Sequence, residues 1–282
     1  MKNFDTRIAT GSLEVAGASV YYEVAGAGPV LLLIPGGASD AGDFARIIGP
    51  LADRYTVVTF DPRGISRSRL TKPAQDLSLD VLADDAHRLL MEVSAAPAYV
   101  LGSSGGGVIG LALAERHPES VRALVAHEPP LVNLLPPGTA SRTSSQVIYD
   151  TYRKVGIGPA IQQFIALSGL GAQGPENGLP PELQEAMAQR MARMQQNVEF
   201  FLAHYLLPVT TYVPDVAALC ASSSRVVVSI GETSSGQLAH DTALALANRL
   251  ESTAVTFPGD HSGFFIFPDL FARKLDEVLR AE

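Results

Sequence analysis

The stretch Tyr99–Val108, Tyr-Val-Leu-Gly-Ser-Ser-Gly-Gly-Gly-Val, joins a short apolar run to a helix-like run that continues to Arg116. A Gly-x-Ser-x-Gly pattern between a strand and a helix predicts a sharp turn with a strained central residue, here Ser104. Such a turn exposes the serine hydroxyl and directs the free N–H groups of the helix N-terminus at whatever the serine attacks. The alternative, a phosphate-binding loop, lacks both the following lysine and the Gly-x-Gly-x-x-Gly pattern. The stretch therefore predicts Ser104 as a nucleophile.

Composition argues against nucleic-acid binding and membrane insertion. The 282 residues are 46% hydrophobic with a formal net charge of −8, whereas nucleic-acid binding depends on basic surfaces. No apolar run approaches the length of about 18 residues that a membrane span needs, and no signal-peptide pattern opens the chain, so we predict a cytoplasmic protein. The single cysteine, Cys220, excludes an intramolecular disulfide and a cysteine-based metal cluster. Its apolar neighbours predict a small buried side chain.

Short apolar runs alternate with helix-like runs over most of the chain. Residues 12–24 alternate as an antiparallel hairpin does, and six later runs have the pattern of buried strands: Val30–Ile34, Thr56–Phe60, Ala98–Leu101, Ala123–Ala126, Arg225–Ile230 and Ala254–Phe257. The expected helices between and after them are 40–51, 78–93, 108–116, 238–250 and 268–279. This alternation predicts a mostly parallel sheet covered on both faces by helices.

The alternation stops between Leu131 and Pro214, where only helical stretches are expected. These are 143–154, 159–168 and 181–205. We therefore predict a core domain of residues 1–130 and 215–282, with residues 131–214 forming a helical cap over the site. Within the cap, apolar side chains recur at steps of three and four residues, which favours a packed helix face, with the wall of a substrate pocket as the alternative: Met187, Met191, Met194, Val198 and Phe201.

A serine hydroxyl is a weak nucleophile until a base removes its proton. Of the six histidines, His261 is the best placed, because it follows the final predicted strand, where the base lies in the Ser…acid…His chain order. His127 neighbours Glu128, so the two side chains point to opposite faces of a strand. The remaining histidines fall within or at the ends of helices, which favours structural roles, with contact to a ligand as the alternative for His204 in the cap: His87, His117, His204 and His240.

The acid that orients this histidine has two main candidates. Glu128 directly follows an apolar strand and precedes two prolines, a position that a solvated surface charge does not explain. Many enzymes of this build carry an aspartate three residues after the glycine that ends the next-to-last strand, but counting from Gly231 gives Ser234. We predict Glu128, with Glu232, another residue or a water-assisted dyad left as alternatives. Asp260 adjoins the histidine and would need a contorted backbone to reach its ring.

Attack on an acyl carbon produces an oxyanion that two preorganised N–H groups should bind. The residue after the nucleophile, Gly105, supplies the first N–H group. The loop after the Val30–Ile34 run, Pro35-Gly36-Gly37, supplies the second from Gly37, because two glycines let the backbone approach a substrate closely.

With these residues in place, the chain resembles the α/β-hydrolase superfamily over nearly its whole length. The matching features, in order, are Pro35-Gly36-Gly37, Asp61–Ser68, the turn at Ser104, a helical cap and Gly259-Asp260-His261. The resemblance implies an α/β-hydrolase fold with a mostly parallel eight-stranded sheet and a helical cap.

A closer resemblance is to the zearalenone hydrolases, serine lactonases of this fold. Their His-Glu-x-Pro segment matches His127-Glu128-Pro129-Pro130, and Phe60-Asp61 and Ser66-Arg67-Ser68 also match. This implies nucleophile Ser104, acid Glu128, base His261 and oxyanion donors Gly37 and Gly105. The chain departs from these lactonases in the cap, because it has no tryptophan to place against a substrate.

We therefore predict a serine hydrolase that cleaves a carboxylic ester or lactone of a hydrophobic small molecule, without a metal or organic cofactor. Carbon–carbon, thioester or perhydrolase chemistry on the same residues is the first alternative. A hydrolase-fold binding protein without activity is the second, prompted by the serine at position 234. The sequence leaves a homodimer open.

Overall fold

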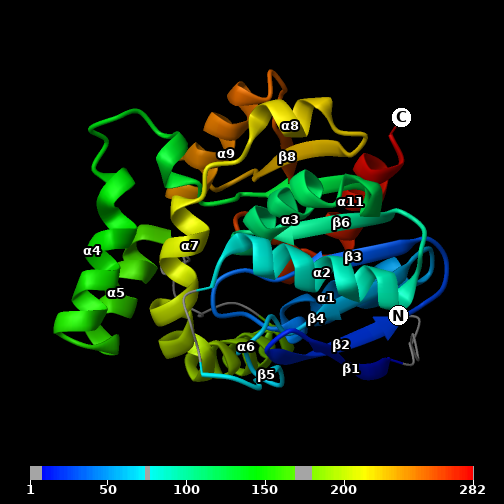
Figure 1. The fold of residues 1–282 in the computed structure, drawn as a ribbon, viewed down its shortest axis with the longest axis horizontal. Helices are drawn as coiled ribbons and strands as arrows, with labels where there is room; N and C mark the ends of the chain where they lie inside the picture. Colours follow the sequence, from blue (N-terminus) through cyan, green and yellow to red (C-terminus); the bar gives the residue numbers. More distant parts are fainter. Residues whose placement is uncertain (1–7, 74–76, 169–179, 282) are drawn as a thin grey trace.

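A nine-stranded sheet forms the centre of the molecule (Figure 1). The computed structural model describes residues 8–73, 77–168 and 180–281. Eight strands follow one another in the order β1-β2-β4-β3-β6-β7-β8-β9, and the two-residue β5 pairs with β2 beside this path. The predicted eight-stranded sheet is thus present, with one short strand added. The strand bounds are β1 Ala9–Val15, β2 Ala18–Ala25, β3 Val30–Ile34, β4 Thr56–Phe60, β5 Arg69–Leu70, β6 Ala98–Ser103, β7 Val121–His127, β8 Arg225–Gly231 and β9 Val255–Phe257.

The pairing is parallel from β4 through β9 and antiparallel where β2 meets β1, β4 and β5. The predicted hairpin and mostly parallel sheet are both confirmed. Because the central strands run in the same direction, the loops that follow β3, β6, β7, β8 and β9 meet at one edge of the sheet.

Helices cover both faces of the sheet. In β3 every residue is buried; Leu32 and Ile34 pack into one core cluster, whereas Leu31 and Leu33 pack into the other. This alternation follows from the two-residue period of a strand. The first cluster contains side chains of α2 (Leu79–Val93), α3 (Gly105–Arg116) and α9 (Leu238–Arg249), and the second those of α1 (Ala45–Ala52) and α11 (Pro268–Arg280).

Local capping chemistry sets the start of α2. Ser78 accepts a hydrogen bond from Val81 N at the start of α2, as a Ser N-cap does. Short one-turn segments complete the core: η1 Ala41–Phe44, η2 Pro118–Ser120, η3 Val132–Leu134 and α10 Gly263–Ile266.

Between β7 and β8 the described chain is helical, and α4 and α5 stand to one side of the sheet (Figure 1). The helices are α4 Ser141–Lys154, α5 Ile157–Ser168, α6 Pro181–Phe200, α7 Leu206–Thr211 and α8 Val216–Ala221. A π-helical segment, Phe201–Tyr205, joins α6 to α7. Pro208 lies four residues after His204, so it has no N–H for the His204 carbonyl, which favours a locally widened helix.

One sequence prediction is wrong here. Cys220 is exposed, not buried. It lies on α8 directly after the buried Leu219, and neighbouring positions of a short surface helix face in different directions. Among the described residues no helix combines the length and the apolar character needed to cross a membrane.

Candidate active site

Ser104 stands at the turn between β6 and α3, with φ 54° and ψ −123°. Such a backbone conformation costs a non-glycine residue energy and persists only where the surroundings enforce it. Gly102 and Gly106 permit it: a Cβ added to Gly102 would lie 2.2 Å from the Gly106 carbonyl oxygen, and one on Gly106 would lie 2.0 Å from the carbonyl oxygen of Ile34. The turn therefore has the form expected from the sequence.

The loop after β3 lies directly against this turn. A Cβ on Gly36 would be 2.7 Å from Ser104 Cβ and 2.8 Å from Gly105 N. Gly37 has φ +58°, and a Cβ added to it would meet nothing within 4 Å, so this residue faces open space. Gly105 opens α3, where the first N–H groups have no acceptor within the helix. Both predicted oxyanion donors thus border the space in front of Ser104.

Glu128 is fully buried at the end of β7, and His261 lies in the loop after β9. His261 Nδ1 is 2.7 Å from Glu128 Oε2. The turn holding Ser104 is tied to the same strand end, because Ser104 N donates to the His127 carbonyl at 2.8 Å. Nucleophile, acid and base candidates therefore converge at the carboxyl ends of neighbouring strands.

The second oxygen of Glu128 is held by the segment after β8. Oε1 accepts hydrogen bonds from Gly231 N, at 2.8 Å, and from the Ser234 hydroxyl. Burial by itself raises the pKa of Glu128, but the hydrogen bond to His261, electrostatic interaction with His127 and His261, and the hydrogen bond from Gly231 N outweigh it and lower the pKa to about 2. Glu128 is therefore ionised at neutral pH. Its φ of 49° is a further strained position, enforced by these contacts.

The hydrogen bond from the Ser234 hydroxyl to Glu128 is a contact of the candidate site that sequence reasoning missed. A serine stands at this position, where an aspartate is usual in enzymes of this build. In the structure, its hydroxyl donates to the carboxylate of Glu128, which the neighbouring strand supplies. The sequence does contain a signal for this contact: the usual position of the acid is occupied by a residue that can donate a hydrogen bond to a carboxylate supplied from another strand.

The alternative acids lie away from this arrangement. Glu232 is exposed. Asp260 turns back on its own loop and accepts from Ser262 N at 2.9 Å. His127 is buried and bonded to Ser229 Oγ at 3.1 Å, and it packs against Phe257 and Phe271.

A cavity of about 430 Å³ lies in front of the turn, and Gly37, Ser104, Gly105 and His261 all border it. Within the described chain, Ser104 Oγ and His261 make no hydrogen bond, and such catalytic contacts commonly tighten only when substrate binds. His204 does not border the cavity; it stacks on Phe200 instead.

The helical insertion between β7 and β8 lines the cavity with apolar side chains. The five residues noted for their helical spacing all line it, although Val198 and Phe201 are also buried in the core as a packed face requires. Both interpretations of this stripe therefore hold: its residues form part of the cavity wall, and two of them also belong to a packed helix face. Three of these five side chains are methionines, which adapt readily to a ligand's shape. The five are Met187, Met191, Met194, Val198 and Phe201.

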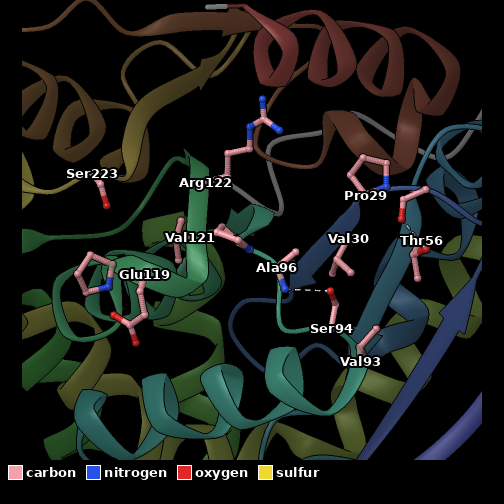
Figure 2. A pocket seen from close by; sticks show the side chains of 13 residues that line it. Pro29, Val30, Thr56, Val93, Ser94, Ala96, Glu119, Val121, Arg122 and Ser223 are labelled. Carbon is pink, nitrogen blue, oxygen red and sulfur yellow. Dashed lines mark hydrogen bonds between the residues drawn. The ribbon is translucent and has the colours of Figure 1, made fainter.

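A larger hollow of about 810 Å³ lies at the opposite edge of the sheet (Figure 2). It is bordered by residues at or before the starts of strands, such as Val30, Thr56 and Val121. None of the candidate residues lies there, and ligands of open α/β sheets bind at the carboxyl ends of the strands. Volume alone therefore does not identify the site.

Among the described residues, one cluster of side chains could hold a metal ion, namely His87, His117 and Glu119. The two imidazole rings are stacked, with centroids 3.9 Å apart and 6° between planes. Parallel rings cannot both direct in-plane lone pairs at one ion, and each already has a partner: His117 Nε2 with Asp84 at 2.8 Å and His87 Nδ1 with Ser120 Oγ at 2.8 Å. The cluster is explained as a structural link between α2 and the end of α3.

Comparison with known proteins agrees with the fold. Residues 29–156 match the family described as the alpha/beta hydrolase fold. An uncharacterized hydrolase, YraK, of Bacillus subtilis is 35% identical over 98% of this chain and 97% of its own. A zearalenone hydrolase of Cladophialophora bantiana is 28% identical over 97% of each chain. The enol-lactonase of Burkholderia xenovorans LB400 superposes with a TM-score of 0.74 at 16% identity, covering 96% of this chain and 100% of that one.

The chain belongs to the α/β hydrolases. It is a hydrolase, similar in sequence and fold to proteins that include a zearalenone hydrolase and a lactonase.

Proposed function

We propose that this protein is a serine hydrolase that cleaves a carboxylic ester or lactone through Ser104, His261 and Glu128. The observation that carries the proposal is the hydrogen bond between Glu128 and His261 Nδ1, at 2.7 Å, on the cavity that Ser104 also borders. The names of two relatives, a zearalenone hydrolase and an enol-lactonase, support ester or lactone chemistry.

In the proposed reaction, His261 takes the proton from Ser104 Oγ as that oxygen attacks the substrate carbonyl carbon. The N–H groups of Gly37 and Gly105 bind the resulting oxyanion. The ionised Glu128 keeps the Nδ1–H of His261 oriented and stabilises the imidazolium that forms. The imidazolium then donates its proton to the departing alkoxide, which leaves an acyl group on Ser104.

Water completes the cycle. His261 removes a proton from a water molecule, whose oxygen attacks the acyl carbon, and the Ser104–acyl bond breaks with return of the proton to Ser104 Oγ. The products are a carboxylic acid and an alcohol, or one hydroxy acid if the substrate is a lactone.

The cavity lining favours a neutral, apolar substrate. Arg190, the one arginine among the lining residues that the structure describes, is neutralised by an ion pair with Asp43, and Asp260 adds a carboxylate. An anionic substrate would find no free cation among these lining residues. Residues 131–214 would act as the cap that shapes this apolar wall.

The test is turnover of a small panel by the wild type and Ser104→Ala. The panel contains p-nitrophenyl esters, macrolactones, acyl thioesters and a diketone. We expect ester or lactone hydrolysis that Ser104→Ala lowers by at least about 10⁴-fold. Exclusive turnover of the thioester or the diketone would contradict the proposed bond type, and equal hydrolysis by the variant would contradict the nucleophile.

A further inference from the structure

Asn197, on α6 of the cap, is buried with 4% of its surface exposed. Its side chain joins two core loops. Nδ2 donates to the Ala38 carbonyl and to Ser66 Oγ, both at 2.9 Å, and Oδ1 accepts from Ser66 N at 2.9 Å. The orientation of the amide is fixed by this network, because a flipped amide would place Oδ1 against the Ala38 carbonyl oxygen.

Ala38 belongs to the turn that presents Gly37. The turn is closed by Ser39 N, which donates to the Gly36 carbonyl at 3.0 Å. Gly36 packs closely against Ser104 and Gly105, whereas a Cβ added to Gly37 would meet nothing within 4 Å. Packing therefore restrains the start of the turn, and the hydrogen bond from Asn197 holds the Ala38 carbonyl on its far side.

The second loop held by Asn197 belongs to the segment Asp61–Ser68, for which the reaction gives no role. Ser66 has φ 46° and donates its hydroxyl to Asp40 Oδ2 at 2.8 Å. Asp61, fully buried, accepts from Ala41 N at 2.9 Å. This segment thus supports residues 38–41, which directly follow the oxyanion turn.

We propose that Asn197 is a positioning residue that fixes the Gly37 turn from the cap and so couples cap docking to oxyanion binding. The single helix α6 then contributes both to the apolar wall of the cavity and to the position of the oxyanion turn. Methionines of α6 line the apolar wall, and Asn197 on another side of the helix holds the turn whose N–H group meets the oxyanion. The proposal rests on the proposed function of Ser104 and Gly37.

The experiment compares Asn197→Asp and Asn197→Leu with two controls on the same helix. Asn197→Asp keeps the shape and the acceptor for Ser66 N but replaces the donor to Ala38 with an oxygen. Asn197→Leu removes all three hydrogen bonds. Gln196→Ala alters an exposed neighbour, and Arg193→Gln removes a different link to the loop, from Arg193 to Asp40 at 3.2 Å, without touching the turn.

Active-site titration with a fluorophosphonate first gives the fraction of competent enzyme, so that kcat and KM are expressed per active site. The inhibition constant of an alkylboronic acid, whose tetrahedral adduct places an oxygen in the oxyanion site, is measured beside them. We expect kcat to fall about 10- to 100-fold in both Asn197 variants, with KM changed less than about threefold. The inhibition constant of the boronic acid should rise by the same factor as kcat falls. In both controls, kcat, KM and this inhibition constant should remain within about threefold of wild type.

A merely structural role would lower the titratable fraction and leave the per-site values unchanged, and that result would overturn the proposal. If Asn197→Leu does not fold, Asn197→Asp decides. The underlying function fails in a different way: wild type that is not labelled at Ser104 refutes the nucleophile, whereas labelled wild type with unchanged per-site values in the Asn197 variants refutes only the positioning role.

Discussion

The two edges of the parallel sheet differ in a way that locates function. The amino edge has the larger hollow, about 810 Å³, bordered by exposed residues such as Glu119 and Arg122. The carboxyl edge has a cavity of about 430 Å³ but combines a buried ionised glutamate, strained residues and close backbone contacts that only glycine permits. Strain and buried charge cost stability and are retained where they contribute to function. Chemistry, not volume, distinguishes the two edges.

After Ser104→Ala, the largest expected effect at the carboxyl edge comes from the acid. Glu128→Gln keeps the side-chain shape but removes the charge that orients His261, so we expect turnover to fall by about 10⁴-fold. Glu232→Gln, the matched exposed carboxylate, should stay within about twofold. Steady-state kinetics on the best ester of the panel measures both, and a crippled Glu232→Gln beside an active Glu128→Gln would reverse the assignment.

Ser234→Ala removes the hydroxyl that Glu128 accepts but leaves the bond from Gly231. A hydrogen bond to a charged group contributes more free energy than one between neutral groups. Because this bond holds the carboxylate that orients His261, we expect kcat/KM to fall about tenfold. The pKa of Glu128 should also rise, because its ionised form loses a donor. A pH–rate profile checks both effects, with the exposed neighbour variant Ser235→Ala as control. Identical profiles for the two variants would remove Ser234 from the site.

The buried His127, at the carboxyl edge, should make the free energy of unfolding depend on pH. Burial lowers its pKa to about 4, below the value near 6.5 of an unfolded histidine. The unfolded state therefore binds the proton first, and the stability from neutral His127 is complete above pH 6.5 and lost as pH falls toward 4.

We expect this loss to reach about 3 kcal/mol in the free energy of unfolding. Urea denaturation between pH 7 and 4 should show it in wild type and lack it in His127→Gln. His87 at the other edge, whose pKa burial also lowers but which is only partly buried, gives the comparison variant His87→Gln with a smaller change. Equal pH dependence in wild type and His127→Gln would contradict the account.

The smallest effect is expected at the amino edge. Arg122 borders the larger hollow and lies 5.1 Å from the centre of the Tyr99 ring. Arg122→Ala should leave kcat/KM for every turned-over substrate within about twofold of wild type. A loss of tenfold or more without a change in unfolding temperature would give that hollow a role in catalysis and break the comparison.

The sequence predicts the fold well where burial is complete. β3 and β4 begin and end at the predicted residues, because β3 is an apolar run buried on two faces and β4 is buried at every residue after Thr56. β5 could not be predicted, since Arg69–Leu70 is too short to show a period. The exposure of Cys220 was missed because apolar neighbours do not define which way a residue on a short helix faces.

The site is predictable only in part. Ser104 and Glu128 stand directly after strands and His261 lies in the loop after β9, so chain order brings all three to one edge. The contacts of Ser234 with Glu128 and of Asn197 with Ala38 join residues more than 100 positions apart. The spacing of apolar residues along a helix or strand therefore cannot predict them. The pocket-lining methionines were recognised as a helix stripe, but which of its sides faces the cavity depends on how α6 docks.

The central claim is that Ser104 is the activated nucleophile at the carboxyl edge. Mass spectrometry of the folded protein after treatment with a fluorophosphonate tests it most directly. We expect one adduct per chain, mapped to the peptide that contains Ser104, absent from Ser104→Ala and formed far more slowly in Glu128→Gln. No adduct on folded wild type, or an adduct that persists in Ser104→Ala, would contradict it.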